Sequence, residues 1–267
     1  MSYQIIIVVA LTFIIHLIAT LAYSVRIVGI RTRHIFVAFS LFNIMVLISR
    51  TANGFQAPLL AKSVENNIRA GIFSAAESDF RLILLSATIA TFAGAALIPT
   101  FQRLLSKAVG QFSENRSVIM LVLKVFTRRG IRAVEDSVTI PKKAHIDRFR
   151  GLGEMPLRII TLNVVVVSFF TVSVLSSLYA GYLNPELRAT SSTLAAIVNG
   201  IPTILMFILI DPYMAGLTDD VLAGKTGEAF FRRCIFFLVA GRFLGTILAQ
   251  LLLVPAAHII VFCAALL

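Results

Sequence analysis

Two arginines lie inside apolar segments that are long enough to cross a membrane. Arg50 lies in the middle of one such segment, and Arg242 lies within the last one. An arginine near the centre of a bilayer costs about 2.5–3.5 kcal/mol on insertion scales, so it usually faces a partner or a hydrated cavity. No acidic residue lies deep in any apolar segment to pair with either arginine. The pattern favours an anionic ligand, and the structural alternative is snorkelling or hydrogen bonding to backbone carbonyls.

Polar residues follow helical spacing around Arg50 and in the first apolar segment. Each residue turns a helix by about 100°, which places one group on a single face: Asn43, Arg50, Asn53 and Gly54. The first segment carries a second polar face, which ends at a basic residue: Thr12, His16, Thr20, Tyr23 and Arg26. Two neighbouring helices with polar faces can line a water-filled cavity. For His16, a hydrogen-bonded packing role is the alternative.

The sequence lacks the common signatures of enzymes, metal sites and nucleotide-driven pumps. It contains no His-Glu-x-x-His, no Gly-x-Ser-x-Gly and no Gly-x-x-x-x-Gly-Lys-Ser/Thr loop. Cys234 and Cys263 lack the paired spacing of a disulfide framework or metal site, and the four histidines are scattered. We therefore predict that the protein is not an enzyme and has no catalytic residue, metal or cofactor.

The composition is that of a membrane protein. Hydrophobic residues make up 58% of the chain, charged residues 14%, and the mean hydropathy is +0.92. Soluble domains average about 45–50% apolar and roughly 25% charged residues, so the excess apolar surface must face lipid. The net charge of +11 comes from stretches between the apolar runs, which predicts cytoplasmic loops near anionic lipids rather than nucleic-acid binding.

These features predict an all-α, polytopic membrane protein of the bacterial inner (cytoplasmic) membrane. Six segments have the length of about 20 residues that a span requires: Gln4–Val25, Ile35–Leu60, Leu82–Leu105, Leu157–Leu183, Ser191–Asp211 and Cys234–Leu267. Basic residues are in excess in the first and third connections, and the two connections on the other side are nearly balanced in charge. The positive-inside rule then places the first, third and fifth connections in the cytoplasm and both termini outside.

We predict a single transmembrane domain over residues 1–267. It comprises a first three-helix half over residues 1–108, a basic cytoplasmic loop over 109–156 and a second three-helix half over 157–267. Within the loop, Ser117–Arg129 has an apolar body that ends in basic residues, which predicts an amphipathic helix on the membrane surface. Packing of this helix beneath the bundle is the alternative.

Three pairs of residues recur at a nearly constant offset in the two halves: Asn43 and Asn199, Pro58 and Pro212, Pro99 and Pro255. Repeats of three spans each would be inverted across the membrane, as in many transporters, whereas chance alignment is the alternative. The stretch Val198–Pro202 predicts a kinked or unwound fifth span. Gly241 and Gly245 form a small-xxx-small pattern that permits close helix contact.

Four stretches resemble the Amj family of bacterial lipid II flippases, the alternate to the MurJ type: residues 16–32, 40–53, 55–60 and 97–101. The resemblance implies a substrate, undecaprenyl pyrophosphate that carries the peptidoglycan disaccharide-pentapeptide, and a role in cell wall biogenesis and cell shape. It implies translocation of the head group from the cytoplasmic to the outer leaflet. The family leads us to expect an acidic residue just before Thr20, where this chain has Ala19.

Basic and polar residues in and near the two polar faces suit such a substrate, because guanidinium groups match phosphate oxygens well. We predict alternating access through an arginine-lined cavity with these substrate-binding residues: Arg26, Arg31, Arg33, Arg50, Asn43, Asn53, His16, Tyr23 and Arg242. Lipid II and membrane lipids are the expected partners, and the sequence leaves the oligomeric state and energy source open. Two alternatives are a small-solute or ion secondary transporter and a non-transporting membrane scaffold.

Overall fold

The computed structural model describes residues 2–73, 76–115, 127, 132, 135–139 and 156–267, and the regular secondary structure in these ranges is entirely helical. The elements, in chain order, are α1 (Tyr3–Thr32), α2 (Ile35–Arg69), α3 (Ala76–Asn115), α7 (Leu157–Leu183), η1 (Pro185–Leu187), α8 (Arg188–Leu205), η2 (Met206–Ile210), α9 (Asp211–Leu222) and α10 (Glu228–Leu266). Within the described ranges, six helices are long and apolar enough to span a membrane, and the fifth is the continuous rod Pro185–Leu222. The predicted all-α fold with six spans is confirmed.

The helices extend beyond the apolar segments that predicted them. Helices α3 and α10 begin with polar residues that precede the apolar segments. Each of these polar starts is stabilised by an ion pair between residues i and i+4. Arg81 pairs with Glu77 in α3, and Arg232 pairs with Glu228 in α10. Hydropathy therefore located the membrane-crossing parts and not the helix ends. Helix α3 also continues through Asn115, past the predicted start of the loop over 109–156, and nearly all of the predicted surface helix over 117–129 lies outside the described residues.

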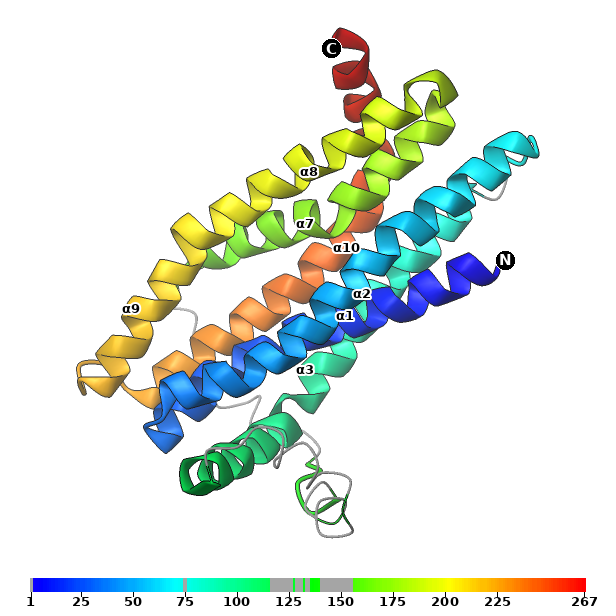
Figure 1. Cartoon of the computed structure of the whole chain (residues 1–267). Coiled ribbons are helices and arrows are strands. Elements are labelled where there is room, and N and C mark those ends of the chain that lie inside the picture. Colours follow the sequence, from blue (N-terminus) through cyan, green and yellow to red (C-terminus); the bar gives the residue numbers. More distant parts are fainter. Residues whose placement is uncertain (1, 74–75, 116–126, 128–131, 133–134, 140–155) are drawn as a thin grey trace.

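The connections between helices gather at two opposite ends of the bundle (Figure 1). The α1–α2 connection and the α9–α10 connection lie at one end, which we call the basic end (residues 31–34 and 223–227). Both chain termini and the α2–α3 and α7–α8 connections lie at the other, which we call the terminal end (residues 2–5, 70–73, 184–187 and 264–267). This grouping is the one that six antiparallel spans require.

Each half of the bundle is built around its first helix. Helix α1 packs against α2 and α3, and α7 packs against α8 and α10. Helices α1 and α7 run in opposite directions (Figure 1). Close contact of α10 with α7 depends on the predicted small residues: a Cβ atom on Gly245 would lie 2.8 Å from the Val164 carbonyl oxygen. The predicted role of the small-xxx-small pattern is thus confirmed.

A matching contact occurs in the first half. A Cβ atom on Gly94 of α3 would lie 2.8 Å from Thr20 Cβ of α1, as one on Gly245 would lie 2.9 Å from Val167 Cβ of α7. The sequence separation between Gly94 and Gly245 equals the separations between the paired glutamates and between the paired arginines at the starts of α3 and α10. Two inverted repeats would produce such matched contacts.

The fifth span departs from regular α-helix at a different place from the one predicted. Helix α8 runs unbroken through Pro202 to Leu205, and the irregular turn is the π-helical η2 just before Pro212. Proline has no amide hydrogen to donate to the preceding turn, so the chain widens there and the Asp211 N–H donates to the Met206 carbonyl instead. The sequence predicted a kinked or unwound helix at Val198–Pro202, and the structure contradicts the unwinding, because α8 is regular there.

Candidate functional site

A cavity of about 590 Å³ lies between the two halves of the bundle. All six spans contribute to its walls: α1, α2, α7, the rod from α8 to α9, and α10, with Ala87 from α3. In α1 the lining residues fall within Thr12–Arg26, in α2 within Phe39–Gln56, and in the rod within Asn199–Met214. These stretches run from the middle of each helix towards the basic end. The cavity therefore lies in the middle of the bundle and in the half next to the basic end, away from the terminal end.

A cluster of apolar side chains fills the bundle on the terminal side of the cavity. It is formed by the terminal-end parts of α1, α2, α3, α7 and α10. Val8, Leu60, Ile83 and Leu253 at its centre are wholly buried. This packing closes the path between the cavity and the terminal end.

Six of the nine predicted binding residues line the cavity: His16, Tyr23, Arg26, Arg50, Asn53 and Arg242. The described lining residues include three arginines and one histidine but a single acid, Asp211. The cavity therefore carries an excess of positive charge within the membrane-spanning part of the protein. Such a site suits an anion, because a guanidinium group that is buried without a counter-ion, as that of Arg242 is, is unfavourable.

Arg242 is the most deeply placed of these charges. Its side chain is 5% exposed, it lies next to the Tyr23 hydroxyl, and its Nε atom has no hydrogen-bond partner. The Tyr23 hydroxyl donates to Asn163 Oδ1 at 3.3 Å, and Asn163 Nδ2 donates to the Leu238 carbonyl at 2.8 Å. In the described part of the chain no carboxylate neutralises Arg242. Neither snorkelling to a membrane surface nor bonding to a backbone carbonyl accounts for its position.

His16 lies on α1 and lines the same cavity as Arg242. It is 5% exposed and lines the cavity, and its Nδ1 atom is buried without a partner. The packing role considered for this histidine would normally include a hydrogen bond at that atom. An unpartnered ring nitrogen leaves His16 able to donate or accept a bond from a ligand in the cavity.

Arg50 and Asn53 on α2 occupy the rim of the cavity. Both line it, and both are exposed at the molecular surface. Among the residues that the structure describes, Arg50 makes no ion pair or side-chain hydrogen bond. Its guanidinium group is thus available to a ligand that enters from outside.

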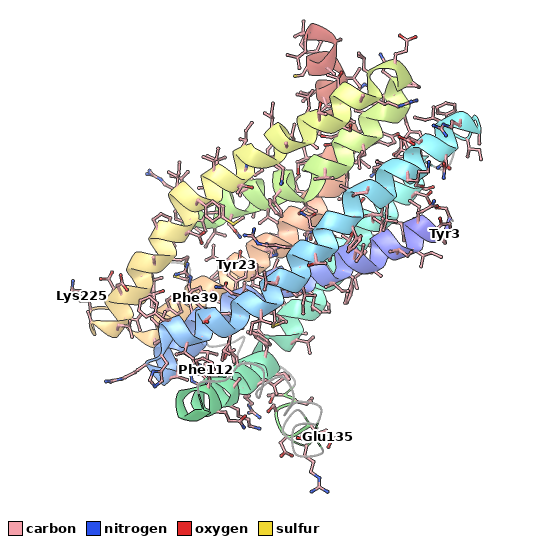
Figure 2. All side chains as sticks on the ribbon, in the orientation of Figure 1. Tyr3, Tyr23, Phe39, Phe112, Glu135 and Lys225 are labelled. Carbon is pink, nitrogen blue, oxygen red and sulfur yellow. The ribbon has the colours of Figure 1, made fainter. Side chains whose placement is uncertain are left out.

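Arg26 has a partner that the sequence did not reveal. Its Nη2 lies 3.6 Å from Asp211 Oδ1, and its guanidinium group lies 5.4 Å from the centre of the Phe39 ring. Tyr23 and Phe39, which both line the cavity, lie between α2 and α9 in Figure 2. Asp211 stood at the end of an apolar segment in the sequence, so only the fold shows that it reaches α1.

Three predicted binding residues do not line the cavity. Arg31 and Arg33 are exposed at the α1–α2 connection, where Arg33 ends α1 with a left-handed φ of 57° and donates its N–H to the Ile30 carbonyl. Asn43 is exposed on α2, beside the face that lines the cavity. The cavity face of α2 follows Phe39, Val46 and Asn53, and Asn43 lies to one side of this line.

Uncharged polar residues form the inner end of the cavity, and the sequence analysis had singled out Thr12 and Asn199 but not their hydrogen-bond partners. Gln56 Nε2 donates to Thr12 Oγ1 at 3.0 Å, which joins α2 to α1. Ser173 Oγ donates to Asn199 Oδ1 at 3.1 Å, which joins α7 to α8. Buried polar residues inside apolar segments were the available signal. Among the described residues, no group of three or more His, Cys, Asp or Glu side chains is placed to hold a metal ion.

A family model described as "Alternate to MurJ", named Amj, matches residues 11–264. The chain belongs to the Amj family. One Amj relative, a Bacillus subtilis (strain 168) protein named lipid II flippase Amj, is 33% identical over 258 residues, which cover 96% of this chain and 95% of the relative. No solved structure is significantly similar to the chain. The resemblance found in residues 16–32, 40–53, 55–60 and 97–101 is therefore confirmed, and it extends over almost the whole length.

One position of this Amj chain has a structural setting that matters for its charge. The resemblance implied an acidic residue before Thr20, and Ala19 stands there instead. Ala19 lines the cavity on α1, between His16 and Tyr23. A carboxylate at this position would face the same space as Arg242. Its absence leaves the cavity of this chain more positive.

Proposed function

We propose that the protein is a lipid II flippase that moves the undecaprenyl-pyrophosphate-linked peptidoglycan precursor from the cytoplasmic to the outer leaflet. The observation that carries this proposal is the arginine-rich cavity, in which neither Arg242 nor Arg50 has a carboxylate partner within the described residues. Membership of the Amj family and the name of the Bacillus subtilis relative support it. The proposed activity is transport rather than catalysis.

The proposed ligand group is the pyrophosphate. Its oxygens accept several charge-assisted hydrogen bonds, and arginine presents five donors in a planar arrangement that fits them. Arg50 at the rim would meet the head group first, and Arg242 with Tyr23 would hold it at mid-membrane. A volume of about 590 Å³ is in the range of sites that hold drug-sized ligands, so it suits the pyrophosphate and part of the attached sugar.

The polyprenyl tail requires that the cavity be reachable from the lipid. Helix α2 packs on α1, α3 and α7, and its contact with α8 and η2 is at most slight, although all of them contribute to the cavity wall. Arg50 on α2 and Phe207 on η2 each line the cavity and are also exposed, Phe207 by 64%. Because these positions lie within spans, the opening between them faces the bilayer. A tail that stays in lipid while its head group enters the cavity fits this arrangement.

Orientation and pseudo-symmetry extend the proposal to a transport cycle. With the basic end in the cytoplasm, as the positive-inside rule predicts, the cavity lies on the cytoplasmic side of the apolar cluster that fills the terminal end. The matched contacts of Gly94 and Gly245 support two inverted repeats. Repeats of this kind let two halves exchange conformations, which would open the same cavity to the opposite side.

A small-solute or ion transporter is the second candidate. The central cavity and the paired halves fit it equally, but a solute pathway needs no opening to the lipid, which the exposure of Arg50 and Phe207 indicates here. A non-transporting scaffold would leave the buried Arg242 charge without a carboxylate partner, and the Nδ1 atom of His16 without a hydrogen bond, for no purpose.

The deciding experiment measures lipid II on the outer surface of cells that lack other flippases. We expect Arg50→Gln to reduce its display at least tenfold, because a lost charge-assisted bond to phosphate is typically worth about 1.5–3 kcal/mol. Arg69→Gln is the matched control, since Arg69 is exposed on the same helix and lies outside the cavity. Normal display by an Arg50→Gln protein present at wild-type levels would remove the cavity from the mechanism.

A further inference from the structure

The ion pair between Arg26 and Asp211 bridges the cavity near the basic end. It joins α1 to the first residue of α9 with a separation of 3.6 Å, and the side chains are 20% and 43% exposed. Asp211 is the one acid among the described residues that line the cavity. The Asp211 carboxylate therefore neutralises part of the positive charge that would otherwise attract an anionic head group.

The π-helical turn places Asp211 opposite Arg26. A π-helical turn holds one residue more than an α-helical turn, and each residue of a helix corresponds to a rotation of about 100°. Without the wider turn at Met206–Ile210, the residues of α9 would be rotated away from their present directions. Pro212 fixes the position of this turn, since it follows Asp211 and lacks an amide hydrogen. The local geometry thus directs this carboxylate towards α1.

A carboxylate and a diphosphate compete for the same donors of an arginine. Both accept paired N–H bonds from a guanidinium group, and the diphosphate offers more oxygens and more charge. Arg26 can serve only one of them fully. The arginine is held near the cavity wall by the Phe39 ring, so it does not need to move to exchange partners.

We propose that Asp211 is a competing carboxylate that occupies Arg26 while the cavity is empty, yields it to a diphosphate head group and reclaims it during release. This inference rests on the proposed function. Transport requires binding that is favourable enough for entry and weak enough for exit. Asp211 therefore sets the affinity of the site for diphosphate without touching the ligand.

The test measures the Kd of the full-length protein in lipid nanodiscs for farnesyl diphosphate by calorimetry. Partly exposed ion pairs are weak, so we expect Asp211→Asn to tighten binding about two- to fivefold and to slow dissociation. In an Arg26→Gln background the same substitution should change the Kd by less than its experimental error. The guanidinium group for which the carboxylate and the diphosphate compete is then missing. Asp211→Glu, which keeps a carboxylate, should bind as the wild type does.

Asp220→Asn is the matched control for charge, because Asp220 lies on α9 outside the cavity and its loss removes one negative charge from the same helix. Its Kd should equal that of the wild type. If Asp211→Asn is not recovered folded, Asp211→Ser makes the same test.

An unchanged Kd in Asp211→Asn would overturn the inference alone, provided that wild-type binding is weakened by Arg50→Gln. An equal gain with and without Arg26 would also overturn it, since the carboxylate would then act through its field and not by competition. Wild-type binding that is absent, or indifferent to Arg50→Gln, would overturn the proposed function and with it this inference.

Discussion

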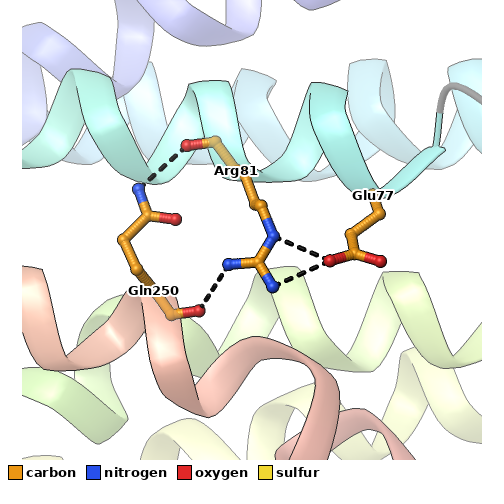
Figure 3. Close-up of polar contacts among 3 residues, drawn as sticks. All are labelled: Glu77, Arg81 and Gln250. Atoms are coloured by element: carbon orange, nitrogen blue, oxygen red, sulfur yellow. Dashed lines mark hydrogen bonds and ion pairs between the residues drawn. The ribbon is translucent and has the colours of Figure 1, made fainter.

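Arg81 and Gln250 each donate a side-chain hydrogen bond to the backbone carbonyl oxygen of the other. Arg81 Nη1 lies 2.9 Å from the Gln250 oxygen, and Gln250 Nε2 lies 3.0 Å from the Arg81 oxygen (Figure 3). Glu77 holds the same guanidinium group through Nε and Nη2. These bonds tie α3 of the first half to α10 of the second, towards the terminal end.

Aromatic contacts join the halves close to these bonds. The Phe80 ring centre lies 5.4 Å from that of Tyr179 and 6.1 Å from that of Tyr182. Asn67 Nδ2 of α2 donates to the Tyr182 hydroxyl at 2.9 Å. The closure of the terminal end is therefore built largely from contacts between the two halves, which must separate there if the cavity is to open outward.

Weakening this closure should expose the terminal end. We expect Asn67→Leu combined with Gln250→Leu to favour the outward-open state by about tenfold, because each lost bond contributes about 0.5–1.5 kcal/mol. Val8 is wholly buried in the terminal-side cluster and serves as the reporter. In a background without native cysteines, Val8→Cys should react correspondingly faster with an impermeant maleimide added outside intact cells.

Val109→Cys is the control for this measurement. Val109 is equally buried but lies towards the basic end of the bundle, so its labelling from outside should stay negligible in both backgrounds. Equal labelling rates of Val8→Cys with and without the two substitutions would show that these bonds do not hold the closure.

The close approach of α10 to α7 makes a prediction about stability. Gly245→Ala should lower the Tm of the purified protein by several degrees, because the added Cβ would lie 2.8 Å from the Val164 carbonyl oxygen and overpacking costs about 1–3 kcal/mol. Gly200→Ala is the control, since no atom lies within 4 Å of its Cβ position, and it should leave the Tm unchanged or raise it. Thermal unfolding of both variants in the same detergent decides the matter. A Gly245→Ala protein as stable as the wild type would mean that the two helices can separate at no cost.

Substitution of Arg242 should affect flippase activity and thermal stability in different ways. A buried charge without a counter-ion is kept at a cost, so Arg242→Gln should leave the Tm unchanged or higher while flippase activity falls at least tenfold. Arg242→Lys should lose activity as well, because a lysine lacks the planar set of donors. The assay pairs thermal unfolding with lipid II display in cells. A marked loss of Tm in Arg242→Gln would assign the arginine a structural role instead.

Much of the site was predictable because the bilayer constrains the sequence strongly. Charges such as Arg50 and Arg242 are conspicuous within apolar segments, and helical periodicity placed His16 and Tyr23 on one face of α1. The same reasoning failed for Asn43, since periodicity gives a face but not the line along which the neighbouring helix passes. It also placed the irregular turn of the fifth span too early, because a proline inside a helix can be accommodated.

The ion pair of Asp211 could not be predicted from the sequence. Its pairing with Arg26 joins residues that are far apart in the chain, and it depends on the number of residues in one helical turn. No local pattern carries such information. The hydrogen bonds of Asn163 and Gln56 escaped prediction for the same reason, since their partners lie on other helices.

The proposed sideways opening between Arg50 and Phe207 gives the concentration of a ligand a different meaning for this protein. A ligand that arrives through the bilayer is counted per lipid of the leaflet, not per litre of water, so dilution of the sample at a fixed lipid ratio leaves occupancy unchanged. Potency of an inhibitor at this entrance would depend on how strongly the compound partitions into the membrane. Amphiphiles that carry a compact anionic group on a greasy chain are thus a natural starting point for blocking it.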